Sequence, residues 1–186
     1  MTRIDARDRL IVALDVPSAG EAEALVDRMG DQVRFVKVGL ELYTVAGPDI
    51  VRKLVARGKR VFLDLKFLDI EETVRRATAR VAAMGAAFLT IHANRKALIA
   101  AVQGRGQSDL KLLAVTVLTN FDGDDLREMG IQRSVRDLVT ARAMLAAEAG
   151  CDGVVASGEE PEAIRAKVGP NLLIVTPGVR PAGNAT

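Results

Sequence analysis

The sequence has few of the residues on which metal, disulfide and base-stacking sites depend. Its 186 residues include one cysteine, one histidine, one tyrosine and no tryptophan. A single cysteine excludes a disulfide framework and a cysteine-based zinc site, and it is typical of a reducing compartment. A single histidine excludes metal sites that need two imidazoles. So few aromatic rings argue against stacking platforms for nucleic-acid bases.

Neither one sign of charge nor long hydrophobic runs dominate the chain. Lys and Arg number 26 and Asp and Glu number 24, giving a net charge of +2 that disfavours a dedicated nucleic-acid binder. The apolar run Leu112–Leu118 is far too short to cross a bilayer. No apolar stretch of signal-peptide length follows the charged N-terminus. With 49% hydrophobic residues, the sequence predicts one soluble, cytoplasmic domain with a full core.

Short apolar runs alternate with longer amphipathic segments along the whole chain. The expected strands are Leu10–Leu14, Phe35–Leu40, Arg60–Leu65, Ala87–Ile91, Leu110–Leu118, Gly153–Val155 and Leu172–Val175. The expected helices are Ala19–Met29, Asp49–Ala56, Ile70–Met84, Arg95–Val102, Val135–Ala149 and Pro161–Val168. Left-handed helix terminators are expected at Gly30, Gly58, Gly85 and Gly150. Strict alternation predicts a parallel sheet with helical crossovers.

Seven strands fit either a doubly wound sheet or most of a (β/α)8 TIM barrel. The sequence contains neither the dinucleotide-binding fingerprint nor the phosphate-loop motif. Charged residues recur where successive strands end, which is where barrels keep their chemistry, at Asp15, Lys37, Asp64 and Lys66. We therefore expect one α/β barrel domain over residues 1–186. Because barrels seldom have fewer than about 200 residues, we expect the last βα unit to be missing and phosphate binding by this chain to be poor.

The four charged strand-end residues form a candidate site. Residues two apart share a face of a strand, so Lys37 shares one with Phe35, and Asp64 and Lys66 share one with Phe62. Unpaired buried charges are costly, so a stable arrangement interleaves the two signs. A purely structural network of salt bridges is the alternative. The spacing D-x-K-x-x-D from Asp64 to Asp69 is weak alone, but here it closes a strand and opens a helix.

Several stretches together resemble the orotidine 5′-monophosphate decarboxylase family, in the family's order and over essentially the whole chain. They are Val12–Asp15, Val36–Gly39 with Glu41, Asp64–Ile70 with Thr73, Thr116–Thr119, and Thr176–Pro181. The resemblance implies a barrel that removes CO2 from C6 of the pyrimidine ring, the last step of UMP synthesis. It also implies that no cofactor or metal takes part.

The resemblance gives each charged side chain a role. It implies that Lys66 protonates the C6 carbanion and that Asp64 lies near the departing carboxylate. It implies that Lys37 bridges Asp64 and the ribose, and that Asp15 accepts hydrogen bonds from the ribose. Asp69 is implied to come from a partner subunit. The implied catalytic set is Lys66, Asp64, Lys37 and Asp69.

The implied substrate contacts lie along the segment after the third expected strand and in two later loops. They are Asp15, Lys37, Asp64, Leu65, Lys66, Phe67, Leu68, Asp69, Ile70, Glu71, Glu72, Thr73, Thr119, Pro177 and Arg180. Asp69 and Thr73 are implied to reach the site of the other subunit in a homodimer. The chain departs from the family at Leu68, Glu71 and Asn120, where the family often has His, Pro and Ser.

Two other functions stay open from the sequence. One is a related enzyme that acts on a sugar phosphate with Mg²⁺ held by acidic residues. The other is a barrel that binds a nucleotide monophosphate without turning it over. We interpret the acidic cluster Asp122, Asp124 and Asp125 as turn and cap formers rather than a metal site. We interpret His92 and Cys151 as structural residues.

Overall fold

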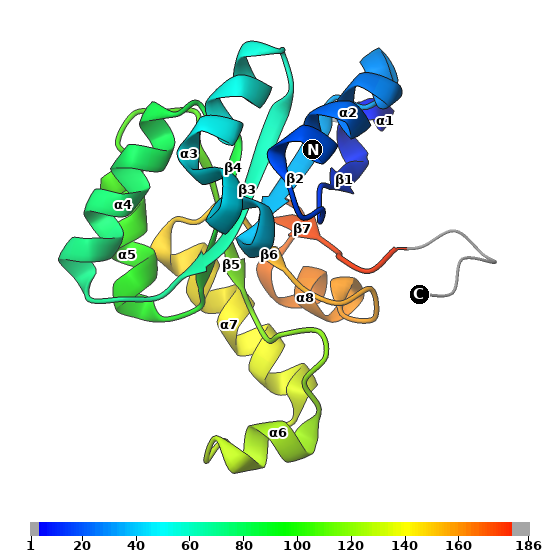
Figure 1. Cartoon of the computed structure of the whole chain (residues 1–186). Coiled ribbons are helices and arrows are strands. Elements are labelled where there is room, and N and C mark those ends of the chain that lie inside the picture. Colours follow the sequence, from blue (N-terminus) through cyan, green and yellow to red (C-terminus); the bar gives the residue numbers. More distant parts are fainter. Residues whose placement is uncertain (1–3, 180–186) are drawn as a thin grey trace.

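The strands follow one another around a single sheet. The computed structural model describes residues 4–179. The strands are β1 (Ile11–Ala13), β2 (Phe35–Gly39), β3 (Arg60–Phe67), β4 (Phe88–His92), β5 (Lys111–Val115), β6 (Gly153–Val155) and β7 (Leu173–Val175). All neighbours pair in parallel, in the order β1-β2-β3-β4-β5-β6-β7. A doubly wound sheet reverses its order at a switch point. This sheet has no reversal, and it curls with the helices on its outer side (Figure 1), as predicted for a barrel.

Helices fill the connections between the strands. They are α1 (Ala6–Arg9), α2 (Ala19–Met29), α3 (Leu40–Ala56), α4 (Glu71–Ala83), α5 (Arg95–Arg105), α6 (Gly123–Glu128), α7 (Val135–Ala149) and α8 (Pro161–Val168), with a 3-10 turn at Gly30–Gln32. The bounds of α2, α7 and α8 agree with the sequence prediction. The four glycines predicted as terminators all have positive φ. Within residues 4–179, no helix combines the length and apolarity that crossing a membrane requires.

Helix α3 begins well before the predicted start at Asp49. It runs from Leu40, immediately after β2, and is interrupted at Gly47, where φ is 62° and ψ is −163°. Pro48 then opens its second part, where a proline's fixed φ suits the first helical turn and its missing N–H costs nothing. The sequence pattern therefore predicted only the second part of α3, because a glycine followed by a proline normally indicates the start of a new helix.

The polar segment between β5 and α7, where no helix is expected from the sequence, contains helix α6, which stands away from the sheet (Figure 1). The Asp122 carboxylate accepts hydrogen bonds from the amides of Asp124 and Asp125, at 2.7 and 3.2 Å. The Asp125 carboxylate in turn accepts the Asp122 amide at 2.8 Å, which completes a capping box. The prediction that these aspartates form caps is confirmed. The predicted fifth strand, in contrast, ends at Val115 rather than Leu118.

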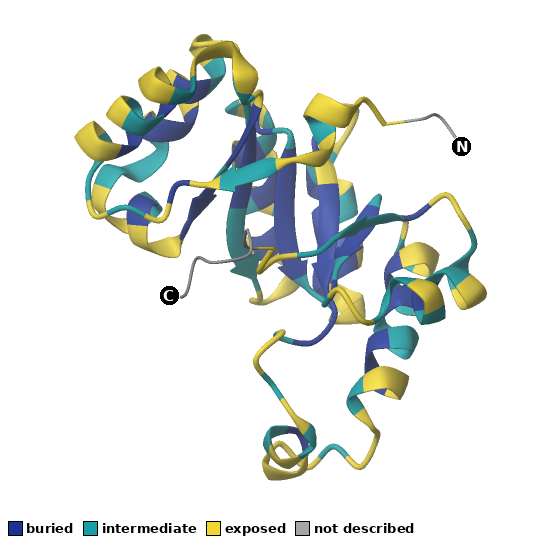
Figure 2. Ribbon diagram, turned by 90° about the vertical axis from the view of Figure 1, so that its right-hand side faces the viewer, coloured by how far each residue is buried: buried dark blue, intermediate teal, exposed yellow. Residues whose placement is uncertain are grey.

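Apolar side chains form two separate cores, one on each face of the sheet. Alternate strand residues such as Leu63, Leu89 and Leu112 pack outward under the helices. The inner face holds a smaller cluster, here called the aromatic layer, made of Phe35, Phe62, Phe88 and Leu113. The rings of Phe35 and Phe88 lie 4.8 Å apart, and those of Phe62 and Phe88 lie 5.9 Å apart. Figure 2 shows this buried sheet surrounded by helices with exposed outer faces.

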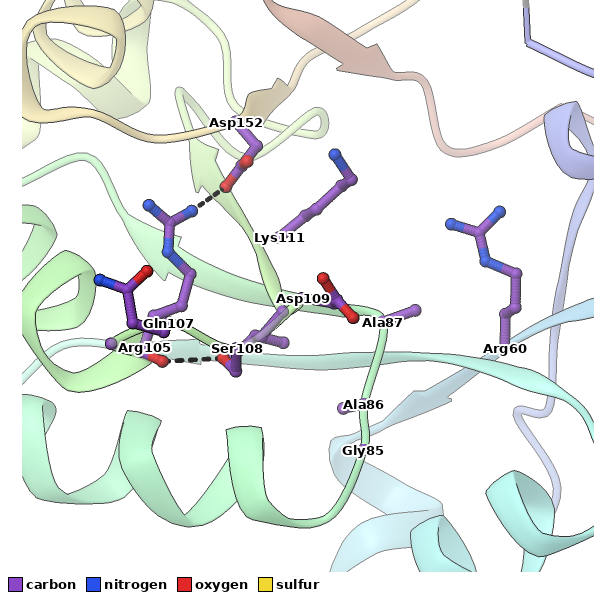
Figure 3. Close-up of a pocket in the computed structure, with 12 residues that line it drawn as sticks. Arg60, Gly85, Ala86, Ala87, Arg105, Gln107, Ser108, Asp109, Lys111 and Asp152 are labelled. Carbon is purple, nitrogen blue, oxygen red and sulfur yellow. Dashed lines mark hydrogen bonds and ion pairs between the residues drawn. The ribbon is translucent and has the colours of Figure 1, made fainter.

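The aromatic layer lies toward the N-terminal ends of the strands, and charged residues cover it there. The Arg60 guanidinium lies 4.5 Å from the centroid of the Phe35 ring and pairs with Asp8 of α1 at 3.1 Å. A pocket of about 630 Å³ opens beside it, with an Arg105–Asp152 ion pair on one side and Arg60 on the other (Figure 3). The ion pairs at this end, Arg60–Asp8 and Arg105–Asp152, therefore border the pocket beside the aromatic layer.

Cys151 lies in the outer core, just before β6. It is a free, buried cysteine, and its burial raises the pKa of the thiol to about 12. The thiol is therefore protonated at neutral pH. The prediction that it is a small core residue is confirmed.

Candidate active site

Two ion pairs occupy the C-terminal ends of the first three strands. Lys37 Nζ lies 2.8 Å from Asp15 Oδ1. Lys66 Nζ lies 3.0 and 2.9 Å from the two carboxylate oxygens of Asp64. These four residues are called the charged layer below. The side chains of Asp64 and Lys37 are 15% and 20% exposed, whereas those of their partners Lys66 and Asp15 are 31% and 58% exposed. Each pair therefore joins a largely buried charge to one that is more open to water.

Gly39 leaves the space in which the first pair forms. It is the last residue of β2 and lies opposite Asp64 of β3 in the sheet register. A Cβ atom at this position would come within 3.2 Å of both Asp15 Oδ1 and Lys37 Nζ. The resemblance implied that Lys37 bridges to Asp64. Among the described residues, however, Lys37 pairs with Asp15, and no ion pair joins it to Asp64.

The backbone at Lys66 departs from regular strand geometry. Its φ of 50° is the one positive value found at a non-glycine residue within residues 4–179. The pairing between β3 and β4 is irregular between Leu63 and Phe67, which brackets this residue. Such strain is uncommon and concentrates at functional sites. Leu65 and Phe67 pack against the outer core, so their side chains point away from the charged layer.

Strand β4 contributes two polar side chains that sequence reasoning did not place in the site. Thr90 is 1% exposed, and its hydroxyl contacts both Lys66 and Asp64. His92 is half-buried; its burial lowers the pKa of the imidazole, and the positive charges of Lys66 and Arg142 lower it further, against the opposing charge of Asp64. The strand pattern held the signal, because positions 88, 90 and 92 share the inner face.

The segment between β3 and α4 lies on the surface. Asp69 is exposed, and its carboxylate accepts a hydrogen bond from the Ile70 amide at 2.7 Å. Within the described chain it forms no ion pair. Leu68, Ile70 and Thr73 are also exposed. Among the described residues, the hydrogen-bond and ion-pair partners of Lys66 are Thr90 and Asp64, and none of these four surface residues is one of them.

Two further residues predicted to contact the substrate, Glu71 and Glu72, form ion pairs at the surface of α4. Glu71 pairs with Lys96 of α5 at 3.2 Å. Glu72 pairs with Arg75 and Arg76, each at 2.8 Å. The hydrogen bond from Arg75 and the two arginine charges lower the pKa of Glu72 to about 2. Both glutamates already have cationic partners on the helix surface.

The remaining predicted contacts lie on later loops. Thr119 and Pro177 are exposed, after β5 and β7 respectively. Arg180 lies outside the described residues. The Arg142 guanidinium of α7 donates to the Thr116 carbonyl at 2.5 Å, which anchors the chain just before Thr119. Within residues 4–179, no three His, Cys, Asp or Glu side chains cluster closely enough to hold a metal ion.

Comparison with known proteins shows the family of this chain. A family model described as "Orotidine 5'-phosphate decarboxylase / HUMPS family" matches residues 8–186. The chain belongs to this family. The family predicted from the sequence is therefore confirmed.

Several members of the family are similar over nearly the whole chain. An orotidine 5'-phosphate decarboxylase of Nitrobacter winogradskyi is 53% identical over 180 residues, covering 97% of this chain and 75% of that protein. One of Rhodopseudomonas palustris is 52% identical over 182 residues, covering 98% and 77%. The crystal structure of an orotidine 5'-phosphate decarboxylase from Lactobacillus acidophilus has a TM-score of 0.87 at 38% identity, covering 93% of this chain and 82% of that one. This structural similarity confirms the predicted barrel-type fold.

Proposed function

We propose that this chain is a carboxy-lyase that converts orotidine 5′-monophosphate (OMP) into UMP, with the charged layer as its active site. The observation that carries the proposal is the Lys66–Asp64 pair. It lies at the C-terminal end of a barrel strand, the end where barrels hold their active sites. The proposal is supported by relatives about half identical in sequence that bear the decarboxylase name.

The chemistry requires a fixed cation beside C6 of the pyrimidine. When the bond between C6 and the carboxylate breaks, its electron pair stays on C6, with no π system to delocalise the charge. The Lys66 ammonium stabilises that charge and then donates a proton to C6. The neutral amine regains a proton from solvent. Asp64 holds the ammonium in place, and its charge repels the substrate carboxylate until CO2 leaves.

The other pair serves substrate binding in this proposal. Lys37 donates hydrogen bonds to the ribose hydroxyls, and Asp15 accepts hydrogen bonds from them. Binding of the sugar therefore replaces part of the contact between Lys37 and Asp15. Thr119 contacts the amide edge of the pyrimidine. Pro177 contacts the substrate, and Arg180 serves to bind its phosphate. No cofactor is needed for any of these steps.

We also propose a homodimer in which Asp69 and Thr73 of each subunit reach the site of the other. Large apolar side chains in the segments that follow β2 and β3 support it: Leu40, Val45, Leu68 and Ile70 are each more than half exposed, with Ile70 at 69%. Apolar groups gathered at one rim are typical of an interface. A second copy would cover them and bring Asp69 to a lysine. A cytoplasmic location fits the single buried thiol.

Pyrimidine absorbance during incubation with OMP tests the proposed function, with and without EDTA. We expect OMP to be consumed and UMP to form at the same rate in both conditions. Loss of activity in EDTA would favour the magnesium-dependent alternative. Binding of UMP without any change in OMP absorbance would instead favour a non-catalytic nucleotide-binding barrel.

A further inference from the structure

Thr90 of β4 lies beside the Lys66–Asp64 pair of the neighbouring strand β3. The Lys66 backbone N–H donates to Thr90 Oγ1 at 2.9 Å. Thr90 Oγ1 lies 2.9 Å from Asp64 Oδ1. The side chain is buried, and the strand is otherwise apolar on both sides of it, with Leu89 and Ile91 in the outer core. One hydroxyl therefore contacts both residues of the pair.

The direction of both hydrogen bonds follows from the groups involved. A backbone N–H can only donate, so the Thr90 oxygen accepts from Lys66. A carboxylate can only accept, so the single hydroxyl proton goes to Asp64. The two hydrogen bonds are compatible, because one uses a lone pair of the hydroxyl oxygen and the other uses its proton. The hydroxyl thus links the backbone of the lysine to the side chain of the aspartate.

The unusual backbone of Lys66 explains why a side chain is needed here. With φ at 50° and an irregular pairing between β3 and β4, the Lys66 N–H points to a side-chain hydroxyl rather than a strand carbonyl. A buried N–H without a partner is costly, and a strained conformation persists only when its surroundings hold it. The Thr90 hydroxyl supplies that partner.

We propose that Thr90 is a positioning residue for decarboxylation, which holds Lys66 in its left-handed conformation and fixes the orientation of Asp64. It touches no substrate atom and acts through these two residues. This inference rests on the proposed function. It also predicts a specific kinetic effect, because a misplacement of reacting groups by about 1 Å can cost about 100-fold in rate.

Thr90→Val tests the proposal, since valine keeps the shape and removes the hydroxyl. We expect kcat for OMP to fall about 10- to 100-fold, while the Kd of UMP changes less than about threefold because its ribose contacts remain. Thr90→Ser keeps the hydroxyl and should restore kcat to near the wild-type value. A purely structural threonine would not give this separation of kcat from binding, and rescue by serine shows that the hydroxyl rather than the methyl group is responsible.

Thr78→Val is the matched control. Thr78 is equally buried, but its hydroxyl has no hydrogen-bond partner among the described residues. Its replacement should leave kcat unchanged and should not lower the melting temperature. If Thr90→Val does not fold, Thr90→Ser against Thr90→Ala carries the test, because both lose the methyl group and only serine keeps the hydroxyl.

Two results would overturn the inference. One is wild-type kcat in Thr90→Val. The other is a parallel loss of kcat, UMP affinity and melting temperature that serine does not rescue. Failure of the proposed function is distinguishable, since the unmodified chain would then not consume OMP at all.

Discussion

Two layers inside the same barrel, only two residues apart along each strand, differ in every physical respect. On β2, Phe35 is followed on the inner face by Lys37, and on β3, Phe62 is followed by Asp64. The first of each pair belongs to the buried aromatic layer, and the second to the ion-paired charged layer. On the same strand, the residue nearer the N-terminal end packs in the core, and the residue nearer the C-terminal end belongs to the candidate active site.

The two layers should therefore contribute differently to stability and to activity. Buried aromatic rings remove large apolar areas from water and pack edge to face, which stabilises the fold. Half-exposed ion pairs contribute little net stability, because desolvation offsets their attraction. Four substitutions test this division, from the largest expected effect to the smallest.

Lys66→Ala, which removes one residue of the charged layer, should have the largest effect, a loss of catalytic activity. Removing both the cation beside C6 and the proton donor should lower kcat for OMP by at least about 10³-fold. UMP should still bind, and the free energy of unfolding should change little. Steady-state kinetics and UMP titration measure these quantities. Lys111→Ala, at the opposite end of the strands, is the control and should keep full activity. Wild-type turnover by Lys66→Ala would contradict the assignment.

Phe88→Ala should break the aromatic layer instead. Phe88 contacts the rings of both Phe35 and Phe62, so its truncation should cost about 3–5 kcal/mol of unfolding free energy. The folded fraction should keep near-normal kcat. Denaturant unfolding measures the loss, and Phe88→Leu should lose less because it refills most of the space. Unchanged stability together with a large loss of kcat would show that the two layers are not separable.

Gly39→Ala should sharpen the comparison within the charged layer. The added Cβ would crowd both Asp15 and Lys37, whereas the Gly39 φ of −93° is open to alanine. We expect KM for OMP to rise about tenfold, equivalent to about 1.4 kcal/mol, with a smaller change in kcat. Gly20→Ala is the control, because nothing lies within 4 Å of that added atom. Equal KM values for the two variants would argue against a substrate-binding role for the Lys37–Asp15 pair.

His92→Gln should have the smallest effect, visible only in the pH dependence of stability. Burial lowers the pKa of His92 in the folded protein below its ordinary value of 6.5. Below pH 6.5 the unfolded chain therefore binds more protons, and stability falls as the pH drops from 6.5 toward the folded-state pKa. Melting temperatures of both proteins across pH 5–8 measure this. The wild type should lose more stability than His92→Gln on acidification, and parallel curves would contradict the prediction.

Much of the fold was predictable because local patterns and tertiary packing agree. Buried parallel strands need continuous apolar runs, and the amphipathic helices between them end at glycines such as Gly85 and Gly150. The pattern was wrong where a local signal lay inside an element. Gly47 and Pro48 interrupt α3 without ending it, and the capping box at Asp122 starts a helix where none was predicted.

The site was predictable in its residue types and less so in its pairings. Strand-end positions placed Asp15, Lys37, Asp64 and Lys66 at one rim. The partner of Lys37 depended on which side chains meet across β1 and β2, and the sequence did not contain that register. The alternation along β4 places Thr90 on the inner face, but an uncharged threonine in an apolar strand does not by itself indicate a site residue.

The sequence by itself determined the barrel class and the family, because both depend on local periodicity and on motifs read along one chain. It also determined which charges end the strands. Only the tertiary structure decided how those charges pair, why β3 is irregular beside β4, and which hydroxyl satisfies the left-handed Lys66. The physical reason is that these are contacts between strands. They depend on register and side-chain direction, which no single segment of the chain specifies.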